Sequence, residues 1–256
     1  MKLLVGLLVI TAFSFTADAS ISFVNLGTAD QFAVLAATTV TNSGLTLISG
    51  DLGVWSGTSI TGFLPGIVTN GTIHSADAVA QQAQADLTTG YNFAAGLACQ
   101  TVLTGQNLGG LTLTPGSYCF TSSAQLTGVL TLDGLGDPNA VFVFQIGSTL
   151  TTASASQVLL TNGTSGFDVF WQVGSSATLG TTTAFQGNIL ALASITLNTG
   201  ASIGCGSALA RTGAVTLDTN VISACDAPTG VPEPATAALA AVTLPGLLWL
   251  ARRRRS

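Results

Sequence analysis

The sequence predicts a mainly β fold, a solenoid of stacked β-coils with one α-helix packed alongside. Three observations support this prediction: a dipeptide that recurs at a nearly constant interval, short apolar runs separated by glycine-containing turns, and one segment with helical periodicity. Hydrophobic residues make up 47% of the 256 residues, which favours a folded core over a disordered chain.

The repeat is marked by the dipeptide Thr-Leu, which recurs between residues 112 and 217 at positions 112, 131, 149, 178, 196 and 216. The successive steps are 19, 18, 29, 18 and 20 residues. Four copies extend to Thr-Leu-x-Thr, starting at Thr149, Thr178, Thr196 and Thr216. A period of this length with alternating apolar residues predicts coils that bury Leu, Ile, Val and Phe against the coils above and below. The 29-residue step predicts one coil with an insertion near residues 161–166.

Residues 21–72 are expected to form further coils, because their apolar runs are broken by Asn-Ser-Gly and Ser-Gly turns. Residues 75–98 instead have helical spacing, which predicts an amphipathic helix that ends near Gly96. Its inner face is expected to hold Ala76, Val79, Ala83, Leu87, Tyr91 and Ala94. Gln81, Gln82 and Gln84 are expected to point outward or sideways. His74 is expected to be a polar or capping residue at the helix start.

Residues 1–19 are typical of a secretory signal peptide: Lys2 gives a positive start, residues 3–12 are apolar, and Ala17-Asp18-Ala19 has the form of a cleavage site. A buried N-terminal strand is the less favoured alternative. At the other end, the sequence Val231, Pro232, Glu233, Pro234 precedes an apolar run at 235–251 and then four arginines. The run is at the short end for a membrane helix, and the arginines would stay cytoplasmic.

These three C-terminal parts resemble the PEP-CTERM sorting signal of Gram-negative bacteria. The resemblance implies export, transient membrane anchoring and processing near Pro232 by a membrane-bound exosortase-type enzyme, which would leave the protein extracellular or on the outer cell surface. A simple tail anchor is the alternative. The expected organisation is a signal peptide at 1–19, a β-solenoid domain at 20–227, and a sorting segment at 228–256 with its membrane stretch at 235–251.

The four cysteines fit an exported protein, because disulfides form in oxidising compartments. The proposed pairs are Cys99 with Cys119 and Cys205 with Cys225, and each would close a loop of about 20 residues, worth roughly 3 kcal/mol. Four cysteines can pair in more than one way, so the connectivity stays open. A zinc site built from all four is the rival interpretation, which the lack of Cys-x-x-Cys spacing disfavours.

The charge composition excludes several classes of function. Only 7% of residues are charged, and residues 20–234 hold a single base, Arg211, which excludes a nucleic-acid binder. His74 is the only histidine and Glu233 the only glutamate. A histidine-based triad, a multi-histidine metal site and a glutamate pair are therefore excluded by count, and no cofactor is expected.

Two further groups of residues give weaker indications, one about calcium binding and one about the burial of two aromatic side chains. Asp133, Asp137, Asp168 and Asp218 would bind calcium only if they converged, and all lie near expected turns, where aspartate is common. Phe170 and Trp171 are consecutive in a strand-like run. Strand alternation predicts one of them in the core and the other near the surface.

The order of elements and several local phrases resemble one known family. The phrases are Leu26-Gly27-Thr28-Ala29, Phe32-Ala33-Val34-Leu35-Ala36, Gly50-Asp51-Leu52-Gly53-Val54, Leu113-Thr114-Pro115-Gly116-Ser117-Tyr118, Asp137-Pro138-Asn139-Ala140-Val141-Phe142 and Val169-Phe170-Trp171-Gln172-Val173-Gly174. Together they closely resemble the ice-binding protein family of cold-habitat bacteria, fungi and diatoms, over residues 24–224. The resemblance implies a right-handed β-helix of triangular section with an α-helix alongside, in which sequence order and coil order differ.

The family binds ice through one flat face with a Thr-Ala/Gly-x-Thr/Asn pattern. The resemblance therefore implies an ice-contacting set at the matching positions of four coils: Thr152, Ser154, Thr181, Thr183, Thr199, Ser202 and Thr219. Threonine is stiff at χ1 and stacked strands repeat at about 4.8 Å, so such an array holds hydroxyl and methyl groups in fixed places. The ladder formed by the Thr-Leu-x-Thr copies is a second candidate for the working face.

The leading hypothesis is a secreted, non-catalytic ice-binding protein, with antifreeze or ice-recrystallisation-inhibition activity, whose partner is the ice crystal surface. The alternative is an exopolysaccharide matrix or adhesion protein without ice activity, since threonine is favoured in any β-structure. A polysaccharide-degrading β-helix enzyme is disfavoured by the scarcity of acids and bases.

Overall fold

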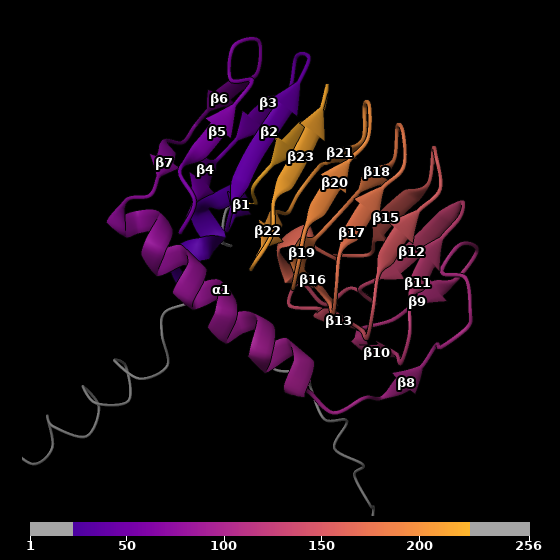
Figure 1. Ribbon diagram of the computed structural model, residues 1–256. Coiled ribbons are helices and arrows are strands. Elements are labelled where there is room, and N and C mark those ends of the chain that lie inside the picture. The colour runs from indigo at the N-terminus through magenta and orange to yellow at the C-terminus, as the bar shows by residue number, and fades with distance from the viewer. Residues whose placement is uncertain (1–22, 226–256) are drawn as a thin grey trace, which may run out of the picture.

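The computed structural model describes residues 23–225 and shows a three-sided solenoid of parallel β-strands with one long α-helix on its side (Figure 1). Each full coil contributes one strand to each of three sheets. The mainly β fold predicted from the sequence is confirmed. Both targeting segments inferred from the sequence lie outside the described residues.

We name the sheets A, B and C. Sheet A has the order β7 (Ile73–Ser75), β4 (Asp51–Val54), β1 (Phe32–Ala36), β22 (Ala208–Ala210), β19 (Asn188–Ala191), β16 (Val169–Val173), β13 (Phe142–Ile146), β10 (Gly116–Phe120) and β8 (Thr101–Val102). Sheet B has the order β11 (Ala124–Leu126), β14 (Leu150–Thr152), β17 (Ala177–Leu179), β20 (Ile195–Leu197), β23 (Val215–Asp218), β2 (Thr39–Ser43) and β5 (Ser59–Thr61). Sheet C has the order β6 (Ile67–Thr69), β3 (Leu47–Ser49), β24 (Val221–Ser223), β21 (Ser202–Ile203), β18 (Ala184–Phe185), β15 (Gln157–Thr161), β12 (Val129–Asp133) and β9 (Thr112–Leu113).

The coil order differs from the sequence order, as the family resemblance implies. The first coil of the chain, β1 to β3, stacks on the last coil, β22 to β24, in all three sheets. Val34 lies opposite Ala208 in sheet A, Val40 opposite Val215 in sheet B, and Leu47 opposite Val221 in sheet C. The two ends of the described chain therefore meet in the middle of the stack.

The helix α1 (Ala78–Gly96) carries the chain from the β7 end of the stack to the β8 end, along the outside of sheet A (Figure 1). The prediction of a helix that ends near Gly96 is confirmed. Strands of sheet A are buried on both faces, because their outward side chains pack against α1 and against the segment around the 3-10 helix η1 (Gly27–Gln31). The outward set is Leu35, Val143, Phe170, Leu190 and Leu209.

Four details of the sequence interpretation are wrong. Ala76 precedes α1, with a left-handed backbone φ of 52°, and is not part of the helix. Val79 is 39% exposed and does not belong to the inner helix face. Gln84 is buried there instead, because its amide nitrogen donates to the Ala210 carbonyl oxygen at 3.1 Å. Phe170 and Trp171 are both fully buried, since Trp171 faces the solenoid core while Phe170 faces α1.

The expected insertion lies between β15 and β16, where residues 162–168 include the 3-10 helix η2 (Gly166–Asp168). Both expected disulfides form: Cys99 bonds Cys119, and Cys205 bonds Cys225. The first joins the segment after α1 to β10. The second joins two successive coils just after their strands in sheet C, β21 and β24. Within residues 23–225, no helix combines the length and apolar character needed to cross a membrane.

Candidate binding face

A row of threonines runs across the outer surface of sheet B. The parallel register aligns one outward side chain from each of its seven strands. This threonine row consists of Gln125, Thr151, Thr178, Thr196, Thr216, Thr41 and Thr61. Strands lie about 4.8 Å apart, so the row is about 29 Å long. Six of its seven members present a hydroxyl and a methyl group at equivalent positions.

The backbone and core hold these side chains in place. Each threonine follows an inward apolar residue such as Ile195 or Val215, which is fully buried in the solenoid core. Branching at Cβ restricts χ1, so the hydroxyl and methyl of each threonine occupy few positions. The Oγ1 atoms of Thr41 and Thr216 lie 3.5 Å apart, which shows how closely neighbouring members approach.

A second row lies two residues earlier in the sequence, at the first residue of the strand or directly before it. This serine row consists of Ser123, Thr149, Ser176, Ser194, Ala214, Thr39 and Ser59. Its hydroxyls partly bind within the protein: Thr149 Oγ1 donates to Ser123 Oγ at 2.8 Å, and Ser194 Oγ accepts from the Ala214 backbone N–H at 3.2 Å. Together the two rows form a grid of about 4.8 by 6.7 Å, set by the strand spacing and by the two-residue repeat.

The strands of sheet B are almost free of charge. Their only ionisable residue is Asp218, at the last position of β23, next to the turn into sheet C. Its carboxylate accepts hydrogen bonds from the hydroxyls of Thr199 and Thr219. The carboxylate is thus bound by neighbouring hydroxyls at the border, and the two rows themselves contain no ionised group.

Neither of the other sheets offers a comparable surface. Much of sheet A is covered by α1. The corresponding outward positions of sheet C are chemically mixed, and they are Val129, Gln157, Ala184, Ser202, Val221, Leu47 and Ile67. Regular spacing is present there, but no side-chain chemistry repeats along it.

The structure does not bring the seven family-pattern residues together on one face. Thr152 and Thr183 are buried, because their Oγ1 atoms bond each other at 2.8 Å inside the corner between sheets B and C. Thr152 Oγ1 also accepts from the Gly180 N–H at 2.8 Å. The sequence interpretation, which assigned these two residues to an exposed face, is therefore corrected: they are buried, and their hydroxyls stabilise the turn.

The other five residues are spread along the same corner. Ser154, Thr181, Thr199 and Thr219 are exposed in the turns that follow sheet B, and Ser202 lies half-buried in β21 of sheet C. Thr219 adopts a left-handed backbone with φ of 54°, where the chain turns sharply. The Ala155 N–H donates to the Thr181 carbonyl oxygen and the Thr182 N–H to the Thr199 carbonyl oxygen, so these turns stack in register along the border of the grid.

The second candidate ladder, formed by the Thr-Leu-x-Thr copies, lies on sheet B, but one of its four threonines belongs to the other row. Thr178, Thr196 and Thr216 are members of the threonine row. Thr149 is not, since Thr151 pairs with Thr178 and Thr149 falls in the serine row. Two other Thr-Leu copies belong to another sheet altogether, because Thr112 and Thr131 pair in sheet C.

Sequence reasoning missed Gln125 and three threonines of the threonine row: Thr151, Thr41 and Thr61. The signal that finds them is an apolar residue followed by threonine, as in Leu150-Thr151 and Val40-Thr41. That order places the apolar side chain inward and the threonine outward. Neither this order nor Thr-Leu reports which sheet a strand joins, because Leu111-Thr112 and Leu130-Thr131 lie in sheet C.

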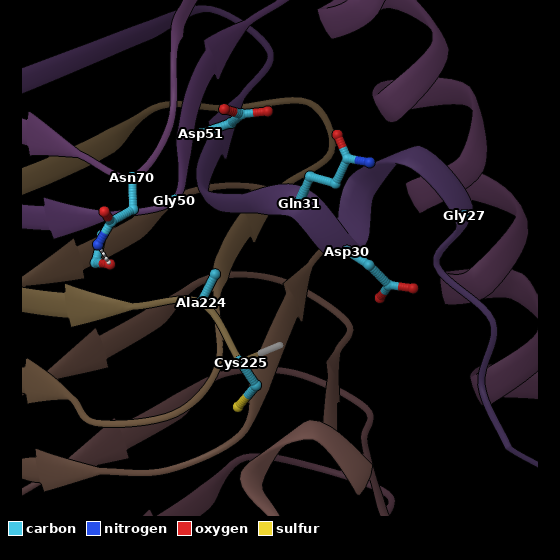
Figure 2. A pocket seen from close by; sticks show the side chains of 9 residues that line it. Gly27, Asp30, Gln31, Gly50, Asp51, Asn70, Ala224 and Cys225 are labelled. Carbon is cyan, nitrogen blue, oxygen red and sulfur yellow. Dashed lines mark hydrogen bonds between the residues drawn. The ribbon is translucent and has the colours of Figure 1, made fainter. Parts of the chain in front are cut away.

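A cavity of about 640 Å³ lies away from the grid, beside η1 (Figure 2). Asp30, Asp51 and Asn70 contribute to its lining. Burial raises the pKa of Asp30 to about 7, and the Asp86 carboxylate adds to the rise. In Figure 2 the carboxylates of Asp30 and Asp51 come from different segments and point away from each other. They therefore do not form the close carboxylate pair that acid–base hydrolysis uses.

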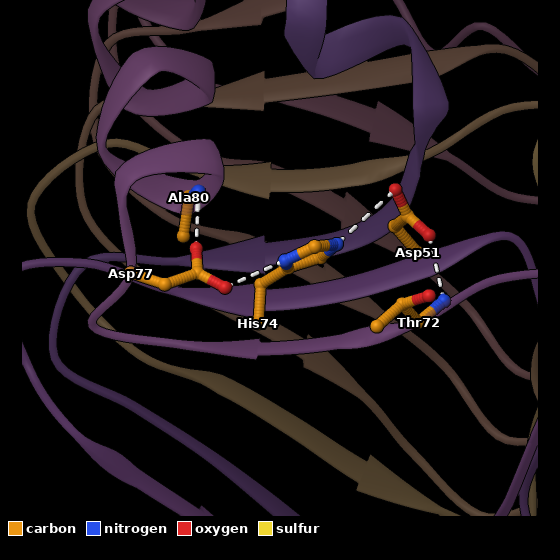
Figure 3. Close-up of polar contacts among 5 residues, drawn as sticks. All are labelled: Asp51, Thr72, His74, Asp77 and Ala80. Carbon is orange, nitrogen blue, oxygen red and sulfur yellow. Dashed lines mark hydrogen bonds and ion pairs between the residues drawn. The ribbon is translucent and has the colours of Figure 1, made fainter.

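The single histidine lies between two carboxylates (Figure 3). His74 Nδ1 donates to Asp77 Oδ2 at 2.7 Å, and its Nε2 lies 3.6 Å from Asp51 Oδ2. Asp77 is the N-cap of α1, since its Oδ1 accepts from the Ala80 N–H at 2.9 Å. His74 itself lies in β7, shortly before the helix, and Asp77 rather than His74 is the cap. The network joins β4 and β7 to α1. Residues 23–225 contain no group of three or more His, Cys, Asp or Glu side chains arranged to hold a metal ion.

Comparison with known proteins agrees with this architecture. A family model described as Ice-binding-like matches residues 34–223. An ice-binding protein of Nostoc sp. (strain HG1) is 61% identical over 219 residues, which cover 85% of this chain and 81% of the relative.

Two solved structures show the same fold. The crystal structure of an ice binding protein from an Antarctic biological consortium has a TM-score of 0.77 and 50% identity, and covers 84% of this chain and 96% of that one. The ice-binding protein of the Antarctic ascomycete Antarctomyces psychrotrophicus has a TM-score of 0.77 and 44% identity, and covers 80% of this chain and all of that one (100%). The chain therefore belongs to the ice-binding-like family.

Proposed function

We propose that this protein binds ice through the outer surface of sheet B and acts without catalysis. The observation that carries the proposal is the threonine row, in which register rather than sequence order aligns equivalent hydroxyls and methyls over six of the seven strands of sheet B. Adsorption of this kind has no reaction step, and it needs only a surface that matches the spacing of ordered water.

Rigidity is the physical reason why such a surface holds ice. Each contact with a water molecule is weak, so binding depends on how little conformational freedom is lost when the contacts form. The threonine side chains of the row have restricted χ1, and their strands are pinned by a fully buried core. Methyl groups gain from leaving liquid water, while hydroxyls fix the position of the neighbouring lattice.

Low charge is the second requirement, and sheet B meets it. An ionised side chain orders its own hydration shell, which competes with the lattice of ice. The only carboxylate on the strands of sheet B, Asp218, is bound by two threonine hydroxyls at the border. Sheet C shares the scaffold but exposes aliphatic side chains such as Leu47, which is 42% exposed.

The test compares a variant of the grid with a variant elsewhere on the solenoid. Thr196→Lys places a charge in the middle of the threonine row, whereas Thr112→Lys places one at an exposed strand position of sheet C. We expect Thr196→Lys to abolish most of the thermal hysteresis and ice shaping, and Thr112→Lys to leave both unchanged. The proposal fails if the unaltered protein shows neither activity, or if the two variants behave alike.

We also propose that the chain is exported and processed at its C-terminal end. The support is the signal-peptide pattern at 1–19 together with the motif at 231–234, the apolar run and the arginines. An exosortase-type enzyme would remove the segment after transient membrane anchoring. Mass spectrometry of the protein recovered from the host's medium tests this. We expect a mature form that starts at Ser20 and ends near Pro234, and a form that retains the arginines would contradict it.

A further inference from the structure

A groove of about 480 Å³ lies where α1 passes over the corner between sheets A and B. Part of its lining comes from the residues that directly follow three neighbouring strands: Trp55 after β4, Ala37 after β1, and Arg211 after β22. Ala37 is small, so it leaves a depression between the two large side chains. The wall on the helix side is formed by Gln81, Gln84, Ala85 and Thr88.

Arg211 is the only lysine or arginine among residues 23–225, and no carboxylate in this range forms an ion pair with it. Its guanidinium carbon lies 4.3 Å above the centroid of the Tyr91 ring. The ring is itself held, because Tyr91 donates its hydroxyl to the Val173 carbonyl oxygen at 3.3 Å. The Arg211 Nε is buried without a hydrogen-bond partner, a rare and costly condition in a folded protein. The cation is therefore positioned at the groove by an aromatic ring but has no anion.

The other lining residues have aromatic, hydroxyl and amide side chains, which are the types that bind sugars. Trp55 supplies a half-buried indole, and the side chains of Thr38, Ser56 and Thr212 supply hydroxyls. Gln81 adds an exposed amide, a group that can donate and accept at once. Trp55 and Arg211 follow strands that are two steps apart, so they are separated by roughly 10 Å, a span that accommodates about two sugar rings.

We propose that this groove binds an acidic saccharide, with a sugar ring on Trp55 and a carboxylate on Arg211. A neutral sugar would leave the guanidinium without an anion, and a small free anion would leave the indole and the hydroxyls unused. A guanidinium bound to a carboxylate makes a strong, charge-assisted hydrogen bond. This site is separate from the grid on sheet B and does not depend on ice binding. It gives a concrete location to the association with exopolysaccharide that the sequence left as an alternative.

Isothermal titration calorimetry with a short oligogalacturonate tests the proposal, with a neutral oligosaccharide of the same length as the comparison. We expect the oligogalacturonate to bind and the neutral chain to bind at least about tenfold more weakly, since a charged hydrogen bond is worth more than 1.4 kcal/mol. Arg211→Gln and Trp55→Ala should each weaken binding by about tenfold or more. Trp55→Phe keeps an aromatic face and should retain most of the affinity. Asn92→Ala, at an exposed position of α1 that does not line the groove, is the matched control.

Several results would overturn the proposal. They are no binding of the oligogalacturonate, equal binding of the neutral chain, or unchanged affinity in both Arg211→Gln and Trp55→Ala. Complete displacement by an equal concentration of inorganic phosphate would show a simple anion site instead. Circular dichroism melting of each variant separates loss of the site from loss of the fold. The Thr196→Lys variant should bind the oligogalacturonate normally, which keeps this test independent of the ice-binding test.

Discussion

Thr41 and Thr216 lie side by side on sheet B, with their Oγ1 atoms 3.5 Å apart, although 175 residues separate them in the chain. The contact exists because the first coil of the sequence stacks on the last. The N-terminal coils therefore extend the threonine row by two strands, with Thr41 and Thr61, beyond the point where the repeating part of the sequence ends.

Thr41→Lys is expected to impair ice binding about as strongly as Thr196→Lys. The charge would interrupt the threonine row between Thr216 and Thr61, near one end of the grid. Thermal hysteresis at matched protein concentration is the measurement. Full activity in Thr41→Lys would show that the C-terminal coils bind ice alone, and it would remove the N-terminal strands from the face.

Thr152→Val is expected to lower stability without changing ice binding. The substitution removes a buried hydroxyl that bonds Thr183 Oγ1 and accepts from the Gly180 N–H. Leaving such groups unsatisfied costs about 1–3 kcal/mol. The measurements are urea unfolding and thermal hysteresis of the folded variant. Normal stability with lost hysteresis would mean that Thr152 acts at the ice surface after all.

Asp77→Ala is expected to destabilise the fold by about 1 kcal/mol, the usual cost of losing an N-cap. Asp77 accepts from the Ala80 N–H, and this bond is the first cause of the lowered pKa of its carboxyl. The substitution also removes the partner of His74 Nδ1. Thermal melting is the measurement, with Asn92→Ala as the control, since that exposed site caps nothing. Equal melting temperatures for the two variants would contradict the capping role.

Asp30→Asn is expected to stabilise the protein at high pH and to have little effect at low pH. Burial raises the pKa of Asp30 to about 7 in the fold, whereas the carboxyl ionises near 3.8 when unperturbed. The fold thus retains a proton that the unfolded chain loses, so the contribution of Asp30 is complete below about pH 4 and is lost as the pH rises towards 7.

Each pKa unit corresponds to about 1.4 kcal/mol, so the loss is at most about 4 kcal/mol. Urea unfolding of both proteins at pH 4 and pH 8 measures it. Asp168, whose pKa burial raises to about 6, contributes with the same sign and is unchanged by the substitution, so it cancels in the difference. A stability difference between Asp30→Asn and the unaltered chain that does not grow with pH would contradict the burial of Asp30.

The sequence predicts the solenoid, the helix and both disulfides because these follow from local spacing. Apolar residues alternate along the strands and recur every three or four residues in α1. Each cysteine pair spans one coil. The working surface is harder to predict, since it depends on which outward positions align between coils. Thr149 and Thr151 are two residues apart and both point outward, so alternation does not distinguish them. Only the pairing of Thr151 with Thr178 decides which row each joins.

The buried threonines show that inward positions are equally hard to predict from the sequence. Thr152 occupies an inward position that Leu179 and Leu197 fill in the next two coils. Its hydroxyl is accommodated there because Thr183 of the next coil turns towards it. No periodicity in the sequence reports such a pairing across coils, and threonine is equally common in both environments.

The position of β1 to β3 in the stack has a consequence for how the molecule is made. The ribosome synthesises these strands first, but their neighbours β22 to β24 emerge last. The interior of the stack is therefore completed only after synthesis of the β-domain has finished. A chain that stops before β22 therefore leaves β1, β2 and β3 without a neighbour on one side in all three sheets.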